Sequence, residues 1–108
     1  MTKPEETIVE KTDNDKGYVE LEHSFTDTFT GDEVSRKVRF KRPAPKSADR
    51  AQKEMMKSPT RALTNLCMGA IHPDDKSNFQ SDLKLYPGLA STFGGALLKA
   101  CGFADLGN

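Results

Sequence analysis

Few side chains in this sequence are of the kinds that carry out catalysis. The two histidines, His23 and His72, and the two cysteines, Cys67 and Cys101, show none of the CxxC or HxxxH spacings that hold a metal ion. We expect His23 to fill a place in a strand and His72 to cap a helix. No nucleophile, base and orienting group stand together as covalent catalysis requires. The residues therefore predict a protein that is not an enzyme and needs no metal or cofactor.

The acidic and glycine residues that could be assigned a chemical role have simpler structural explanations. Asp74 and Asp75 directly follow Pro73, where the positive end of a helix dipole favours carboxylates. Gly94 and Gly95 follow no strand and do not belong to the GxxxxGK[ST] sequence of a phosphate-binding loop. We expect these two glycines either to bend a helix or to admit another backbone at close range.

Charge is distributed unevenly along the chain although the formal net charge is zero. Residues 1–33 carry ten acids and three bases, whereas residues 34–61 carry ten bases and two acids. The main interpretation is that the two segments pair with each other or form a solvated sheet face. Binding of nucleic-acid phosphates is the alternative, in which the basic surface is formed by Lys37, Arg39, Lys41, Arg42, Lys46 and Arg50.

Several features of the sequence indicate a location in a reducing compartment, away from membranes. Cys67 and Cys101 each lie among apolar residues at helical spacing, which is typical of buried thiols rather than of a disulfide. The N-terminal residues lack the apolar stretch of a signal peptide, and no segment approaches the roughly 18 apolar residues needed to cross a bilayer. We therefore expect a cytoplasmic protein.

Alternating polar and apolar residues predict a β-hairpin over about residues 18–41. Gly31 and Asp32 supply a turn, and the alternation continues on both sides of it. Folding the chain there places apolar residues opposite apolar ones and acids opposite bases. The expected pairs are Phe29–Val34, Asp27–Arg36, Phe25–Val38, His23–Phe40 and Glu22–Lys41. Because a hairpin is not stable alone, its face containing Phe25, Phe29, Val38 and Phe40 must pack on helices or on a partner.

Four short helices are expected after the hairpin, at about residues 48–57, 59–71, 74–85 and 88–101. Pro43 and Pro45 end the second strand, and Ser47 is a suitable N-cap for the first helix. The second helix has the clearest apolar stripe, and Gly102 is a suitable C′ residue for the fourth. The prediction is an α+β fold with a flexible acidic tail over residues 1–16, in which Thr7–Val9 could add an edge strand, and one domain over residues 17–108 (hairpin 17–42, helical part 47–103).

Two apolar groups in the helical part are candidates for binding another protein. Core packing explains both groups, but methionine adapts to varied partners and the groups could form a groove for an apolar helix. The residues concerned are Met55, Met56, Leu85, Tyr86, Leu89 and Phe93.

The order of these elements resembles that of the small tail assembly chaperones of long-tailed bacteriophages and prophages. The resemblance covers about residues 18–103 and lies in Arg39–Pro43, the Arg50–Met56 helix, Pro59–Ile71 and Pro87–Phe103, which ends LYPGLASTFGGALLKACGF. It implies a non-enzymatic protein that binds the tape-measure protein and tail-tube subunits during tail morphogenesis in the host cytoplasm. It leaves self-association open, and a small nucleic-acid-binding regulator or a structural tail or neck subunit remain the alternatives.

Overall fold

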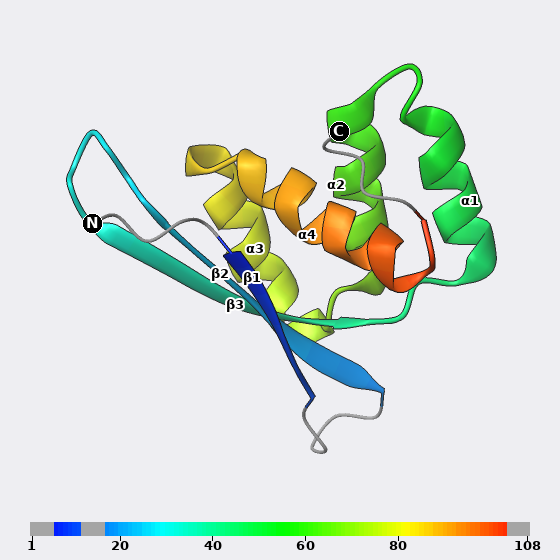
Figure 1. Cartoon of the computed structure of the whole chain (residues 1–108), viewed down its shortest axis with the longest axis horizontal. Helices are drawn as coiled ribbons and strands as arrows, with labels where there is room; N and C mark the ends of the chain where they lie inside the picture. Colours follow the sequence, from blue (N-terminus) through cyan, green and yellow to red (C-terminus); the bar gives the residue numbers. More distant parts are fainter. Residues whose placement is uncertain (1–5, 12–16, 104–108) are drawn as a thin grey trace.

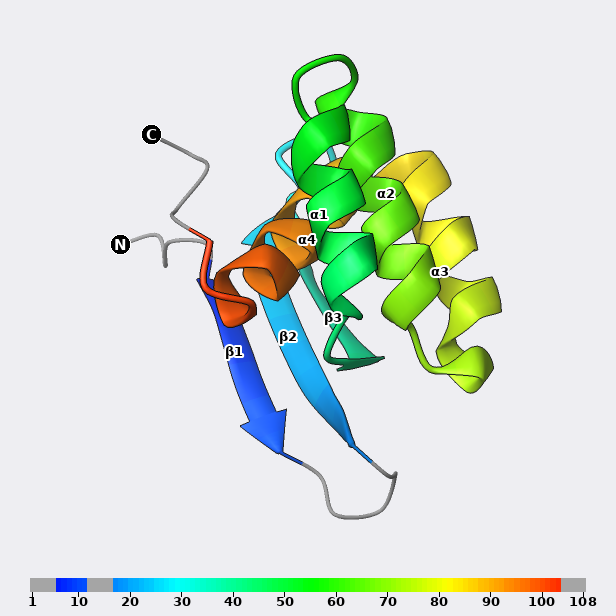
Figure 2. The ribbon, with the colours of Figure 1, turned by 90° about the vertical axis from the view of Figure 1, so that its right-hand side faces the viewer.

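A three-stranded antiparallel sheet forms one layer of the molecule and the helices lie on one side of it, with the first helix packed on the second beyond the end of the sheet (Figures 1 and 2). The computed structural model describes residues 6–11 and 17–103. The elements are β1 (Glu6–Lys11), β2 (Tyr18–Thr26), β3 (Glu33–Lys41), α1 (Pro45–Glu54), α2 (Pro59–Ala70), α3 (Pro73–Leu85) and α4 (Gly88–Ala100). The predicted α+β fold, with a hairpin packed on four helices, is confirmed.

The N-terminal segment contributes a full strand to the sheet. β1 pairs with β2 from Glu6 opposite Ser24 to Lys11 opposite Val19, so β2 is the central strand. The expected edge strand at Thr7–Val9 is therefore confirmed and is longer than predicted. Residues 6–11 of the predicted tail form this strand, and β-branched Thr7, Ile8 and Val9 favour extended backbone there. The other residues assigned to that tail lie outside the described part of the chain.

The pairing of β2 with β3 differs from the predicted register by four residues. Phe25 lies opposite Val34 rather than Val38, and Leu21 lies opposite Val38. Because four is an even number, each residue keeps its predicted face of the sheet, and Leu21, Val34 and Val38 are all buried against the helices. The predicted pairs that prove wrong are Phe29–Val34, Asp27–Arg36, Phe25–Val38, His23–Phe40 and Glu22–Lys41.

The register differs because the turn is larger than the predicted Gly31-Asp32 turn. The strands stop at the Thr26–Glu33 pair, and the loop between them closes through a 2.9 Å hydrogen bond from the Asp27 amide to the Asp32 carbonyl. Gly31 has a φ of 80°, as a turn glycine should. Phe29 therefore lies in this loop and not on the buried face of the hairpin.

Three phenylalanines form the centre of the core. Phe40 of β3, Phe79 of α3 and Phe93 of α4 are each at most 1% exposed, and their ring centroids lie 5.6–6.1 Å apart. Phe40–Phe79 and Phe79–Phe93 meet edge to face, which is a favourable arrangement of ring quadrupoles. These contacts hold the sheet and two helices together.

The helix ends follow the signals in the sequence except in α1, which ends at Glu54 rather than at about Lys57. α1 begins at Pro45, with Ala44 in the N-cap position, rather than after Ser47. Proline is well suited to the first helical turn because no amide hydrogen is required there, so Pro45 starts the helix. The predicted start of the second helix at Ser58-Pro59 is confirmed.

The predicted caps of the last two helices are confirmed. His72 caps α3 by accepting a hydrogen bond of 3.1 Å at Nδ1 from the Asp74 amide. After α4, Gly102 has a φ of 97° and donates to the Lys99 carbonyl, while the Phe103 amide donates to the Leu98 carbonyl. This pair of bonds is a Schellman motif, which satisfies carbonyls at the end of the helix.

Gly94 allows α4 to lie directly against α2. A Cβ atom at Gly94 would lie 2.8 Å from Cβ of Leu63 and 3.1 Å from the Leu63 carbonyl oxygen. At Gly95 a Cβ atom would meet nothing within 4 Å. The expectation of a close backbone approach is confirmed for Gly94 and is wrong for Gly95.

The joint between α2 and α3 is attached to the edge of β3. The Asp75 carboxylate accepts three hydrogen bonds from Arg39, at 2.8 Å from the backbone amide, 3.0 Å from Nε and 2.8 Å from a terminal guanidinium nitrogen. The His72 amide donates to the Arg39 carbonyl, and Ile71 forms a β-bridge with Phe40. The hydrogen bonds from the Arg39 side chain are the main reason that the pKa of Asp75 lies below its ordinary value. Desolvation of the carboxylate acts in the opposite direction but is outweighed.

Candidate protein-interaction surface

The largest exposed apolar side chains gather toward two ends of the molecule. Phe29 is 99% exposed in the β2–β3 loop, and Leu85 is 68% exposed at the end of α3. These two residues line the same hollow, of about 930 Å³. Met56 is 89% exposed in the turn between α1 and α2, toward the opposite end of the longest axis (Figure 1).

Asp27 orders the loop that carries Phe29. Its Oδ1 accepts hydrogen bonds from the amides of Phe29 at 2.9 Å and Thr30 at 3.4 Å, and its carbonyl accepts the Gly31 amide at 2.7 Å. This is the Asx arrangement, in which a short acidic side chain takes the place of a backbone acceptor. The exposed phenyl ring is therefore carried by a loop whose backbone is held by hydrogen bonds.

Tyr86 fixes the same loop to the joint between α3 and α4. The Tyr86 hydroxyl donates to Oδ2 of Asp27 at 2.9 Å. This bond is the main reason that the pKa of Asp27 lies below, and that of Tyr86 above, its ordinary value. The Tyr86 ring also meets Phe25 edge to face at 5.0 Å and lies 5.9 Å from the Arg36 guanidinium. Arg36 in turn pairs with Asp82 of α3 at 3.0 Å.

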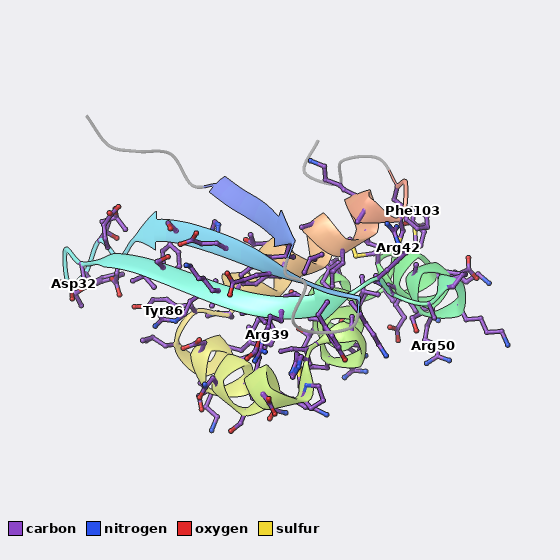
Figure 3. The ribbon with its side chains drawn as sticks, turned by 90° about the horizontal axis from the view of Figure 1, so that it is seen from below. Asp32, Arg39, Arg42, Arg50, Tyr86 and Phe103 are labelled. Atoms are coloured by element: carbon purple, nitrogen blue, oxygen red, sulfur yellow. The ribbon has the colours of Figure 1, made fainter. Side chains whose placement is uncertain are left out.

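These contacts define a surface that we call the loop-end surface. It presents apolar side chains beside two exposed acids, and its members are Phe29, Leu85, Tyr86, Asp32 and Glu33. A second hollow, of about 260 Å³, shares Phe25, Leu85 and Tyr86 with the first and is also lined by Pro87 and Leu89. Figure 3 shows Asp32 and Tyr86 toward the same end of the sheet.

The six residues predicted to bind a partner do not form one surface. Leu89 and Phe93 are 2% and 0% exposed and belong to the core. Met55 packs against the core, whereas Met56 is exposed beside it. Leu85 and Tyr86 remain, together on the loop-end surface.

Phe29 is the residue of this surface that the sequence interpretation placed wrongly. The DTFTGD sequence of residues 27–32 contained the signal, because an aspartate at the start of a glycine-containing loop commonly binds the amides that follow it. A loop beginning at Asp27 places Phe29 outside the strands.

The predicted basic surface is divided among several partners and elements. Arg39 is bound to Asp75, Arg42 donates to the Ala100 carbonyl at 2.7 Å, and Lys37 lies opposite Glu22 in the sheet. Figure 3 shows Arg39, Arg42 and Arg50 at different positions along the molecule. Lys41 is exposed at the end of β3, and Lys46 and Arg50 lie on exposed positions of α1.

The histidines and cysteines have structural surroundings. His23 is 5% exposed and stacks on Phe25 with 5.5 Å between ring centroids. Burial raises the pKa of the Cys67 thiol to about 12, so this group is a neutral core side chain at ordinary pH. Across residues 6–11 and 17–103, no group of three histidine, cysteine or acidic residues is placed to hold a metal ion. In the same residues, no helix is both long and apolar enough to cross a membrane.

The fold defined by this sheet and these helices also occurs in a solved structure. The chain is similar to the uncharacterised protein RBSTP2171 from Bacillus stearothermophilus, with a TM-score of 0.62 and 22% sequence identity over 81% of this chain and 86% of that one. At this identity the likeness concerns the fold. The chain belongs to the family described as domain of unknown function DUF6848, whose model matches residues 19–108. No curated protein matches the sequence.

Proposed function

We propose that this chain is a non-enzymatic protein-binding module that acts as a tail assembly chaperone of a bacteriophage or prophage. Its clients are the tape-measure protein, tail-tube subunits or both, which it binds in the cytoplasm of the host bacterium. The tail-assembly role rests on the resemblance of the sequence to that family. The protein-binding role is supported by one observation above the others, the exposure of Phe29 and Leu85 beside the same hollow.

The way in which Phe29 is held supports a binding role. Apolar side chains that are exposed close together often mark interaction sites, and Phe29 and Leu85 line the same hollow. Here the Asp27 hydrogen bonds to the Phe29 amide and the Tyr86 hydroxyl order the loop backbone that carries the ring before any partner arrives. This loop therefore loses less conformational entropy when a partner binds than an unordered loop would.

The size of the hollow is suited to side chains of an apolar helix. Its volume of about 930 Å³ exceeds what one large side chain fills, and apolar Phe25, Val34 and Leu85 contribute to its lining. An amphipathic client helix would place residues at positions i, i+3 and i+4 against this lining. Tape-measure proteins offer long helices of that kind.

Co-expression with a tape-measure protein, taken from a candidate gene beside this one, tests the proposal. We expect the native chain to form a complex with it and to raise its soluble yield, and F29S and L85S to weaken both effects. M56S is the matched control, because Met56 is similarly exposed but lies at the other end of the molecule. If the native chain captures neither the tape-measure nor the tail-tube protein, the proposal fails.

The nucleic-acid alternative makes a different prediction about salt. Lys46, Arg50, Lys53 and Lys57 all line one shallow hollow on α1, but Asp49 and Glu54 share it. A DNA titration at rising salt would give a steep fall in affinity if phosphates are the ligand. A structural tail or neck subunit, the remaining alternative, would be found by mass analysis of purified particles, whereas a chaperone would be missing from them.

A further inference from the structure

The two ends of the molecule carry opposite charge, and each exposes an apolar side chain. Residues 27–36 and 82–86, around the loop-end surface, contain four acids and two bases. Residues 46–61, around the turn between α1 and α2, contain five bases and two acids. Asp32 and Arg50 lie toward opposite ends of the view in Figure 3.

The second end forms a surface that we call the basic turn. Met56 is 89% exposed at its centre, and the neighbouring exposed residues Lys53, Lys57 and Arg61 surround it in the sequence. Lys53 has an ion pair of 3.3 Å with Asp49, but both side chains are more than half exposed, so this pair contributes little and can exchange partners.

We propose that copies of this chain associate head to tail, with the loop-end surface of one copy bound to the basic turn of the next. Met56 of one copy then enters the hollow beside Phe29 and Leu85 of the other. Asp32 and Glu33 lie near Lys53 and Lys57 across the contact. Both the apolar groups and the charges are complementary, and this complementarity selects the basic turn as the occupant of the hollow.

Charge also disfavours the symmetric alternatives. Two loop-end surfaces brought together would place Asp32 and Glu33 against the same acids of the other copy, and two basic turns would oppose Lys53 and Lys57 with lysines. Like charges at a contact disfavour association and act as a selection against wrong partners. The contact is therefore heterologous, and each added copy leaves one end of each kind available, so rings or open chains result.

The contact concerns a few side chains at each end, so we expect weak, reversible association that salt suppresses. Self-association needs no client and is measured on the purified protein alone. Because Phe29 and Leu85 belong to both contacts, a client helix would compete with the next copy for the loop-end surface.

Sedimentation velocity of two variants and their mixture tests the arrangement. The native chain should form larger species at high protein concentration and low salt, while F29S and M56S alone should each associate about tenfold more weakly. M56S keeps a native loop-end surface and F29S keeps a native basic turn. An equimolar mixture of the two should therefore form dimers and no larger species, because the remaining ends are both defective.

Three results would overturn the proposal. The native chain could remain monomeric at every concentration in low salt, the mixture could remain monomeric, or M56S could associate like the native chain while F29S does not. The last result would mean a symmetric loop-end contact. Q80A, at an exposed position of α3, is the control for substitution itself and should behave like the native chain.

Exchange of charges supplies a second, independent measurement. D32K/E33K and K53E/K57E should each weaken association. In their mixture the two remaining native ends can form dimers, and the reversed loop-end surface should bind the reversed basic turn, so that species larger than dimers return. Those larger species require that the reversed residues meet across the contact. The results are also separable from those on the client, since M56S should lose self-association and retain client binding, whereas F29S should lose both.

Discussion

The core around Phe93 and the loop-end surface around Phe29 are built from the same kind of residue but differ in what surrounds it. Phe93 is 0% exposed and touches Phe40 and Phe79, whereas Phe29 is 99% exposed. Both regions are held by groups from distant parts of the sequence, with Arg39 and Asp75 near the core and Asp27 and Tyr86 at the loop. The comparison teaches that order and burial are separate properties here, and that a few hydrogen bonds can order the backbone of a loop that carries an exposed ring.

Removing one phenyl ring from each region should give the largest difference in the free energy of unfolding. F93A should lower the free energy of unfolding by about 3–5 kcal/mol, because a buried ring leaves a cavity. F29A should change it by no more than about 0.5 kcal/mol, because the ring is exposed before and after unfolding. Urea denaturation of the two variants checks this, and similar losses for both would contradict the assigned burial.

Breaking the contact between Arg39 and Asp75 should have the next largest effect. D75N should cost about 1.5–3 kcal/mol, since hydrogen bonds to a partly buried charged group are lost. D74N is the control, because the Asp74 side chain is 77% exposed, and it should change stability by about 0.5 kcal/mol or less.

The effect of Asp75 should also depend on pH. Its folded-state pKa lies below the ordinary value of 3.8, so its contribution is complete above that value and is lost as the pH falls through the lower, folded-state pKa. Denaturation at pH values from neutral down into that window should show a fall in the native chain that D75N reduces. An equal fall in both proteins would contradict this role for Asp75.

Adding a methyl group should have opposite effects on stability at the two adjacent glycines, Gly94 and Gly95. G94A should destabilise the protein by about 1–3 kcal/mol, because the new Cβ would overlap Leu63 of α2. G95A, with open space at its Cβ, should be neutral or should stabilise α4 by up to about 1 kcal/mol. Thermal unfolding of the pair provides the measurement, and equal effects would show that α2 and α4 do not meet at Gly94.

Removing the Tyr86 hydroxyl should change the loop more than the stability of the fold. In Y86F we expect faster amide hydrogen exchange at Phe29 and Thr30, because Asp27 loses the donor that holds its carboxylate in place. In the native chain the same contact should weaken as the pH falls through the lowered pKa of Asp27. Exchange rates that match those of the native chain would mean that Asp27 orders the loop without Tyr86.

Local patterns in the sequence were sufficient to predict which elements form and which faces they bury. Alternation placed Val38 and Phe40 on the inner face of the hairpin, and Leu89 and Phe93 were assigned to one apolar group of the helical part. These features depend on residues close in the sequence, and so do the caps at Ser58, His72 and Gly102. The resemblance to tail assembly chaperones stays a prediction.

The features that could not be predicted depend on contacts between distant residues or on the geometry of a loop. The register changed by four positions because Asp27 closes a larger loop, although the alternation fitted both registers. Arg39 belonged to the predicted basic surface, yet its partner Asp75 lies in a helix that no local pattern could place beside β3. The same limit explains why each of the two apolar groups combined an exposed residue, Met56 or Leu85, with residues that pack in or against the core.

The attachment of the α2–α3 joint to β3 has a consequence for the growth of the sheet. The outer edge of a strand can pair with a strand from another molecule, and such pairing is a common start of aggregation. Here the Arg39 amide and carbonyl are occupied by Asp75 and His72, and Phe40 is bridged to Ile71. A foreign strand cannot continue along β3 past this position, so a folded molecule resists becoming the template for a fibril at this end of its sheet.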